Sequence, residues 1–117
     1  MSQNTVSLNR PFVVRGACVT ATATLTGGTN TTLLTGDSAY SLDLVEITIA
    51  NNSTLSASVA LKDDGTTVRT LNIPLGGTVQ LQFPIPAPQG RKGGIWSVDM
   101  EDISGTTLSV DAIFIKN

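Results

Sequence analysis

The sequence contains no histidine and only one cysteine, Cys18. Without histidine the chain cannot form a Ser-His-Asp triad, a Cys-His dyad or a histidine-based zinc or iron site. A single cysteine also excludes an internal disulfide and a thiolate-based structural zinc site. We therefore expect no enzymatic activity, no metal and no cofactor. Cys18 lies among Ala17, Val19 and Ala21, which predicts a small core residue.

Charged and aromatic residues are both scarce. Charged residues make up 14% of the chain, against roughly 25% in typical soluble domains. Aromatic residues make up 4% and hydrophobic residues 40%, so Val, Leu, Ile and Ala must build most of the core. Because low surface charge favours association, we interpret this composition as a sign that another protein covers part of the surface. The alternative is a monomer with one face coated by threonine.

The distribution of charge argues against nucleic acid and membrane partners. The net charge is −2 and the seven basic residues are scattered, with Arg91-Lys92 as the only adjacent pair. Nucleic-acid binding needs Lys and Arg concentrated along one face. No apolar run approaches the roughly 20 residues of a membrane span. Residues 1–4 are polar and give no indication of a signal peptide, so we expect synthesis in the cytoplasm.

The length of 117 residues corresponds to one ordinary domain. Residues 1–16 differ from the rest, because Pro11 interrupts any strand and is followed by an apolar hook, Phe12, Val13 and Val14. We predict an extended N-terminal arm over 1–16 and a single domain over 17–117. The alternatives for the hook are a frayed terminus and an arm packed on its own domain.

Residues 17–117 alternate apolar and polar side chains with a period of two, which is typical of strands with one buried face. Together the segments predict an all-β fold, an antiparallel β-sandwich of about eight strands that is jelly-roll-like. Spacing does not order the strands, so an immunoglobulin-like order stays open. The predicted strands are Ala17–Leu25, Thr31–Thr35, Leu42–Ala50, Leu55–Lys62, Thr67–Ile73, Thr78–Phe83, Ile95–Glu101 and Thr107–Lys116.

Three local signals refine this prediction. The alternation in 42–50 changes parity near Leu44-Val45, which indicates either a β-bulge or a strand buried on both faces. Asp64-Gly65 favours a two-residue type I′ hairpin. Prolines at 84, 86 and 88 predict a stiff connection rather than a strand, leading to a mobile tip at 90–94.

Few residues suggest a binding chemistry. Acidic residues at 99, 101, 102 and 111 could in principle bind calcium or act as glycosidase carboxylates. Asp99 and Glu101 alternate on the polar face of a predicted strand, as solvated residues normally do, and we favour this interpretation. Trp96 shares parity with Val98 and Met100, so we expect it in the core; an exposed Trp96 or Tyr40 would instead indicate a carbohydrate-binding platform.

From Leu44 to Lys116 the chain resembles small β-sandwich decoration, or cement, proteins of tailed bacteriophage capsids. The resemblance is carried by a pattern of strand, polar turn, strand, P-x-G-G-T, strand and proline-rich loop. Its segments are Val45–Asn51, Leu61–Thr66, Ile73–Val79 and Leu108–Ile113. Tail and fibre domains share these motifs, so a carbohydrate- or receptor-binding module of a phage tail or fibre is the alternative.

The resemblance implies a structural protein on the capsid exterior of the virion. Such a subunit associates with itself, with a homotrimer favoured over a homodimer, and binds the major capsid protein to stabilise contacts between its copies. Each candidate contact also has a structural alternative, namely a packed arm, a solvated loop or a strand covered on both faces. The partner-binding candidates are Phe12, Val13, Val14, Pro84, Pro86, Arg91, Lys92, Ile113 and Ile115.

Overall fold

Eight β-strands account for most of residues 18–117, the part of the chain that the computed structural model describes. Their number and order agree with the sequence prediction, and most boundaries fall within two residues of the predicted ones. The strands are β1 (Cys18–Thr26), β2 (Asn30–Thr35), β3 (Leu42–Asn51), β4 (Ala57–Asp63), β5 (Thr66–Ile73), β6 (Thr78–Ala87), β7 (Ile95–Met100) and β8 (Thr107–Lys116).

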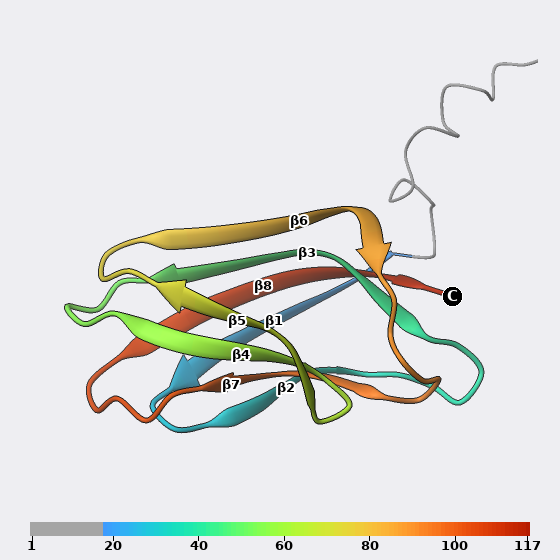
Figure 1. Ribbon diagram of the computed structural model, residues 1–117, viewed down its shortest axis with the longest axis horizontal. Helices are drawn as coiled ribbons and strands as arrows, with labels where there is room; N and C mark the ends of the chain where they lie inside the picture. The colour runs from blue at the N-terminus through green and yellow to red at the C-terminus, as the bar shows by residue number, and fades with distance from the viewer. Residues whose placement is uncertain (1–17) are drawn as a thin grey trace, which may run out of the picture.

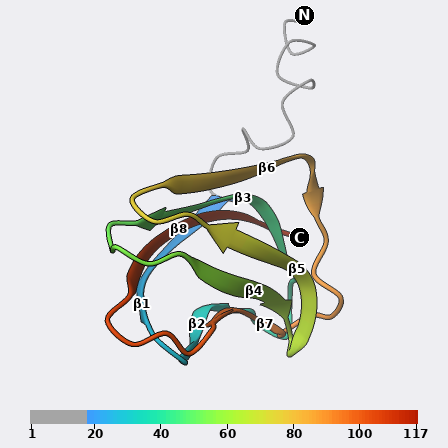
Figure 2. The ribbon, with the colours of Figure 1, turned by 60° about the vertical axis from the view of Figure 1, so that its left-hand side comes forward.

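The strands form two four-stranded sheets that face each other (Figures 1 and 2). One sheet has the order β1-β8-β3-β6 and the other β2-β7-β4-β5, and every recorded pairing is antiparallel. Successive strands cross between sheets except at the β4–β5 hairpin, which is a jelly-roll order. An immunoglobulin sandwich keeps its first two strands in one sheet, whereas β1 and β2 lie in different sheets. The fold is therefore an antiparallel β-sandwich of the jelly-roll type.

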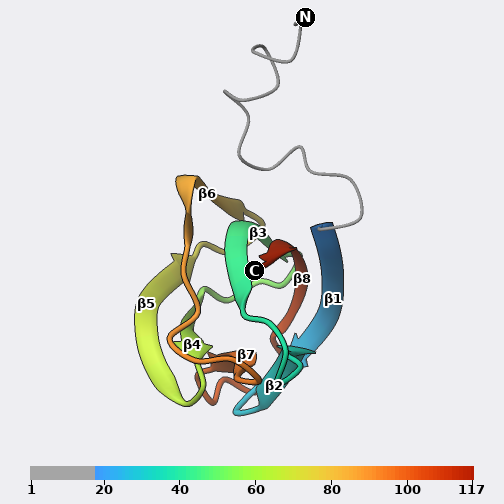
Figure 3. The same cartoon turned by 90° about the vertical axis from the view of Figure 1, so that its right-hand side faces the viewer.

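Figure 3 shows the two sheets end-on, and the hydrophobic core lies between them. On β8 the alternate residues Leu108, Val110, Ala112 and Phe114 are buried. Trp96 is fully buried, with its ring centroid 5.8 Å from that of Phe114. Its indole Nε1 donates a 2.7 Å hydrogen bond to the Leu42 carbonyl. The prediction that Trp96 belongs to the core is confirmed.

A β-bulge causes the irregular alternation in β3. Leu44 pairs with Phe114 and Glu46 pairs with Ile113, so Val45 is an extra residue with no partner in β8. Before the bulge Leu42 and Leu44 face the core, and after it Ile47 and Ile49 do. The bulge thus restores one inward face, which confirms the first of the two alternatives.

The predicted end of the sixth strand at Phe83 is wrong, because β6 continues through the prolines to Ala87. β6 is an edge strand with β3 on one side only, and an edge tolerates residues that have no N–H. The strand still departs from its neighbour here. Gln82 pairs with Glu46 and Ala87 pairs with Leu44, so residues 83–86 are extra residues that form a bend in β6. The bend is visible at the end of β6 in Figure 1.

The β4–β5 hairpin has the predicted turn. Asp63 pairs with Thr66, and the two residues between them, Asp64 and Gly65, have φ values of 50° and 88°. A type I′ turn requires positive φ at both positions. The start of β4 differs from the prediction, because Leu55 lies before the strand and is 47% exposed.

The Asn51 side chain explains this difference. Asn51 is fully buried, and its Nδ2 donates to the carbonyls of Leu55 at 2.8 Å and Ile73 at 3.3 Å. Its Oδ1 accepts a 2.9 Å bond from the Ser53 N–H. One side chain therefore shapes the β3–β4 turn and ties it to the end of β5.

Replacing Asn51 with Ala should lower the free energy of unfolding by about 2–3 kcal/mol, because buried backbone groups lose their partners. Urea denaturation measures this change. The matched control is Asn52→Ala at the exposed neighbouring position, which should change stability by less than about 0.5 kcal/mol. Equal effects of the two substitutions would contradict the role assigned to Asn51.

Candidate partner-binding site

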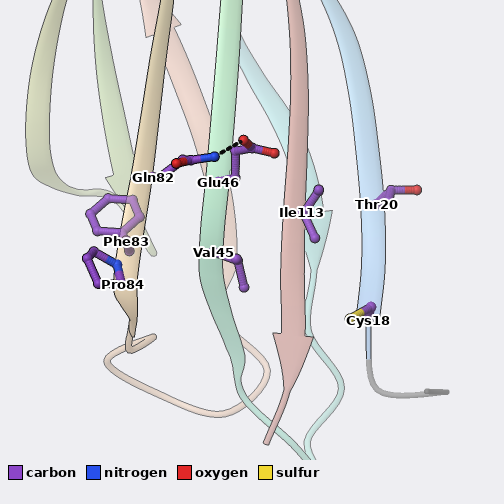
Figure 4. Close-up of a pocket in the computed structure, with 8 residues that line it drawn as sticks. All are labelled: Cys18, Thr20, Val45, Glu46, Gln82, Phe83, Pro84 and Ile113. Carbon is purple, nitrogen blue, oxygen red and sulfur yellow. Dashed lines mark hydrogen bonds between the residues drawn. The ribbon is translucent and has the colours of Figure 1, made fainter. Parts of the chain in front are cut away.

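A hollow of about 570 Å³ lies on the outer face of the β1-β8-β3-β6 sheet, on the side away from the core. We call it the outer hollow. Figure 4 shows its lining side chains on four strands that lie side by side. The lining residues are Cys18 and Thr20 of β1, Ile113 of β8, Val45 and Glu46 of β3, and Gln82, Phe83 and Pro84 of β6.

The floor of the outer hollow is apolar for two separate reasons. On β8 the outward positions change from Ser109 and Asp111 to Ile113 and Ile115 as the strand approaches the hollow. On β3 the bulge adds Val45 to the outer face. Val45 is 7% exposed and Ile115 is 6% exposed, although neither belongs to the core cluster. Outward-facing positions of a sheet are usually polar and solvated, so this end of the sheet is unusual.

One acidic group lies beside the apolar floor. Glu46 Oε1 accepts hydrogen bonds from Nε2 of Gln80 at 2.6 Å and of Gln82 at 2.8 Å, across the β3–β6 pair. These bonds fix the carboxylate on the outer face of the sheet. The outer hollow therefore combines an apolar floor with one oriented negative charge.

The rim of the outer hollow is the bend in β6. Phe83 lines the outer hollow and also a smaller cleft of about 140 Å³ next to Leu61 and Trp96. Pro84 lines the hollow, and Ile85 is 83% exposed. Two prolines flank Ile85 and restrict its backbone, so the bend presents a large apolar side chain on a stiff support.

The structure brings together some of the predicted contact residues. Pro84 and Ile113 line the outer hollow, and Ile115 follows Ile113 on the same face of β8. Pro86 is half-buried at the end of the bend. Phe12, Val13 and Val14 lie outside the described residues. Ile85 and Val45 were not predicted as site residues, although the flanking prolines and the bulge were available signals.

Arg91 and Lys92 lie in the β6–β7 loop, away from the outer hollow. The expected mobile tip is anchored to the β4–β5 hairpin, because the Gly90 N–H donates to Asp63 Oδ2 at 2.6 Å. Arg91 Nη1 lies 3.3 Å from Asp64 Oδ2. Both basic side chains remain exposed, so their predicted contact with a partner stays a prediction.

Gln89 fastens the end of the β6 bend to β3. The side chain is buried, its Oε1 accepts a 2.8 Å bond from the Leu42 N–H, and its own N–H donates to Asp43 Oδ1 at 3.0 Å. Asp43 Oδ2 also accepts a bond from Asn117 Nδ2. A Cβ at Gly94 would lie 2.7 Å from Gln89 Nε2, so this close approach favours glycine.

The prediction for Cys18 is wrong. It was expected in the core, but it is exposed on the outer face, where its position pairs with Ile115. The parity of β1 gives the reason, because Val19 and Ala21 face the core and the residues between them face outwards. Cys18 therefore lines the outer hollow.

The residues considered for calcium, glycosidase or carbohydrate chemistry make contacts within the protein. Asp99 forms a 3.1 Å ion pair with Lys62, and Glu101 Oε1 accepts a 2.6 Å bond from the Ser58 N–H. Within residues 18–117 no three acidic or thiol side chains gather in a metal-binding group. Tyr40 is half-buried, with Lys116 Nζ 5.1 Å from its ring centroid.

No helix in the described part of the chain is long and apolar enough to cross a membrane.

The chain has distant structural similarity to solved proteins, among them a toxin and a viral coat protein. No protein-family model and no curated protein matches the chain. An insecticidal delta-endotoxin, Cry8Ea1 from Bacillus thuringiensis, is 12% identical with a TM-score of 0.44 over 86% of this chain. The chain spans only 19% of the toxin. The coat protein of Tobacco streak virus is 10% identical with a TM-score of 0.44, over 87% of this chain and 88% of that one.

Replacing Gln89 with Ala should release the β6–β7 loop, because the Leu42 N–H would lose its buried acceptor, at a cost of about 1–3 kcal/mol. Trypsin cleavage after Arg91 or Lys92 should then be about tenfold faster when cleavage follows loop opening. Gln80→Ala, at an exposed position outside this network, should leave the rate unchanged. Unchanged cleavage in Gln89→Ala would contradict the anchoring role.

Proposed function

We propose that this chain is a structural virion subunit that decorates the outside of a phage capsid and stabilises contacts between copies of the major capsid protein. In this proposal the subunit acts by binding other proteins and catalyses no reaction. The observation that carries it is the apolar end of the outer sheet face, where Ile85 is 83% exposed beside the outer hollow. Contiguous apolar surface of this kind is typical of protein contact sites.

The stiffness of the surface supports an adhesive role. The outer hollow is built on four paired strands, and Gln89 fastens the bend that carries Ile85 to β3. A preformed surface loses little conformational entropy when it binds. A subunit repeated over a capsid lattice can then combine many weak contacts through avidity.

The composition supports the same role. Only 14% of the residues are charged, and low surface charge favours association over dispersal. Self-association is part of the proposal, with a homotrimer favoured and a homodimer as the alternative. We place the trimer on the capsid exterior, as the sequence resemblance implies.

The carbohydrate-binding alternative receives less support from the site. It needs an exposed aromatic platform, whereas Trp96 is fully buried and Lys116 lies over the ring of Tyr40. Phe83 is half-buried at the sheet edge. These positions leave the apolar rim around Ile85 as the best-supported contact surface.

Replacing Ile85 with Asp should weaken binding to expanded heads of the same virus by at least about tenfold. Burying an isoleucine contributes about 1.5–3 kcal/mol, and each 1.4 kcal/mol is a factor of ten in affinity. Co-sedimentation of the purified subunit with the heads measures the affinity.

The matched control is Leu75→Asp, since Leu75 is 59% exposed in the turn between β5 and β6. It should bind like the unchanged chain. Light scattering after size exclusion gives the oligomeric state in parallel. A chain that stays monomeric and does not bind expanded heads would contradict the proposed function.

A further inference from the structure

We propose that the outer hollow is a docking site for the chain's own apolar hook, Phe12, Val13 and Val14. The hollow is an apolar recess on a sheet face that normally carries polar groups. Its volume of about 570 Å³ can accept several side chains at once. The inference goes beyond the proposed function, because it concerns how a single subunit completes its own surface.

The length of chain before Cys18 allows the hook to reach the hollow. Cys18 is the first described residue, and its side chain lines the hollow. Val14 precedes Cys18 by four residues and Phe12 by six, so an extended chain reaches about 13–22 Å from Cys18. Four neighbouring strands span about 14 Å between the outer two. The hook can therefore reach every wall of the hollow.

Charge complementarity points to the same occupant. Arg10 and Arg15 flank the hook and are two of the seven basic residues in the chain. The strand register places Asp43, Glu46 and Asp111 on the outer face of this sheet, and none of the five described Lys and Arg residues. The hook thus matches the hollow in apolarity, and its flanking arginines match the acidic sheet face around the hollow in charge.

The covalent connection favours the hook of the same chain over that of a second copy. A short flexible tether gives an effective concentration in the millimolar range. A second copy would have to reach a similar concentration in solution to compete. A subunit at micromolar concentration should therefore fill its own hollow.

Cys18 reports on docking, because it is the only cysteine and lines the hollow. We expect a bulky maleimide to label Cys18 about tenfold faster in Val13→Asp than in the unchanged full-length chain, which corresponds to about 1.4 kcal/mol of docking. The matched control is Val6→Asp, which makes the same change on the arm outside the hook. It should label like the unchanged chain.

Equal labelling rates in the three chains would overturn the inference. If the protection of Cys18 from the maleimide disappears when the protein is diluted, the hook comes from a second copy. This result would overturn the intrachain assignment. The assay contains no capsid, so its result is independent of whether Ile85→Asp affects head binding. When the three chains are denatured, Cys18 should be labelled at the same rate in each, which checks that its intrinsic reactivity is unchanged.

A disulfide test gives a second readout. In a Cys18→Ser background, Val13→Cys combined with Ile113→Cys should oxidise to a crosslink within one chain, found by peptide mapping at monomer mass. Val6→Cys combined with Ile113→Cys should crosslink at least about tenfold more slowly, because docking holds only the hook at the floor of the hollow. Crosslinks found only between two chains, or equal rates for both pairs, would contradict the assignment.

Discussion

The candidate site depends on one extra residue in β3. The bulge at Val45 lets Leu44 and Ile47 both face the core and places Val45 and Glu46 on the outer face. At the same point the register of β6 opens, and residues 83–86 bend away from β3. Bulges often redirect side chains at sheet edges. Here the bulge creates an apolar floor and the bend creates its rim.

The rest of the jelly roll holds this arrangement in place. The core beneath the hollow contains Phe114 and Trp96, and the indole of Trp96 donates to the carbonyl of Leu42 at the start of β3. Gln89 binds the N–H of the same residue. Both backbone polar groups of Leu42 therefore have long-range partners, which fixes β3 relative to β7 and to the β6–β7 loop. A surface supported in this way suits repeated contacts better than a flexible one.

Much of the fold could be predicted from local sequence signals. Alternation gave the eight strands, the parity change gave the bulge, and Asp64-Gly65 gave the hairpin turn. The strand order required the structure, because pairing between distant strands leaves no local signal. Cys18 was misassigned because its apolar neighbours suggested burial, whereas its own parity placed it outside. The hollow was partly foreseen through Pro84, Ile113 and Ile115, but no local pattern shows that Val45 and Phe83 meet them from other strands.

The central claim is that the apolar end of the outer sheet face is a contact surface of the assembled particle. Carbene footprinting of the isolated subunit and of the intact virion tests it most directly, because carbenes label accessible side chains of any type. The account predicts that labelling of Ile85 and Pro84 falls on assembly, while labelling of Leu55 and Leu75, in the β3–β4 and β5–β6 turns, does not. Unchanged labelling at Ile85 and Pro84 would contradict the account.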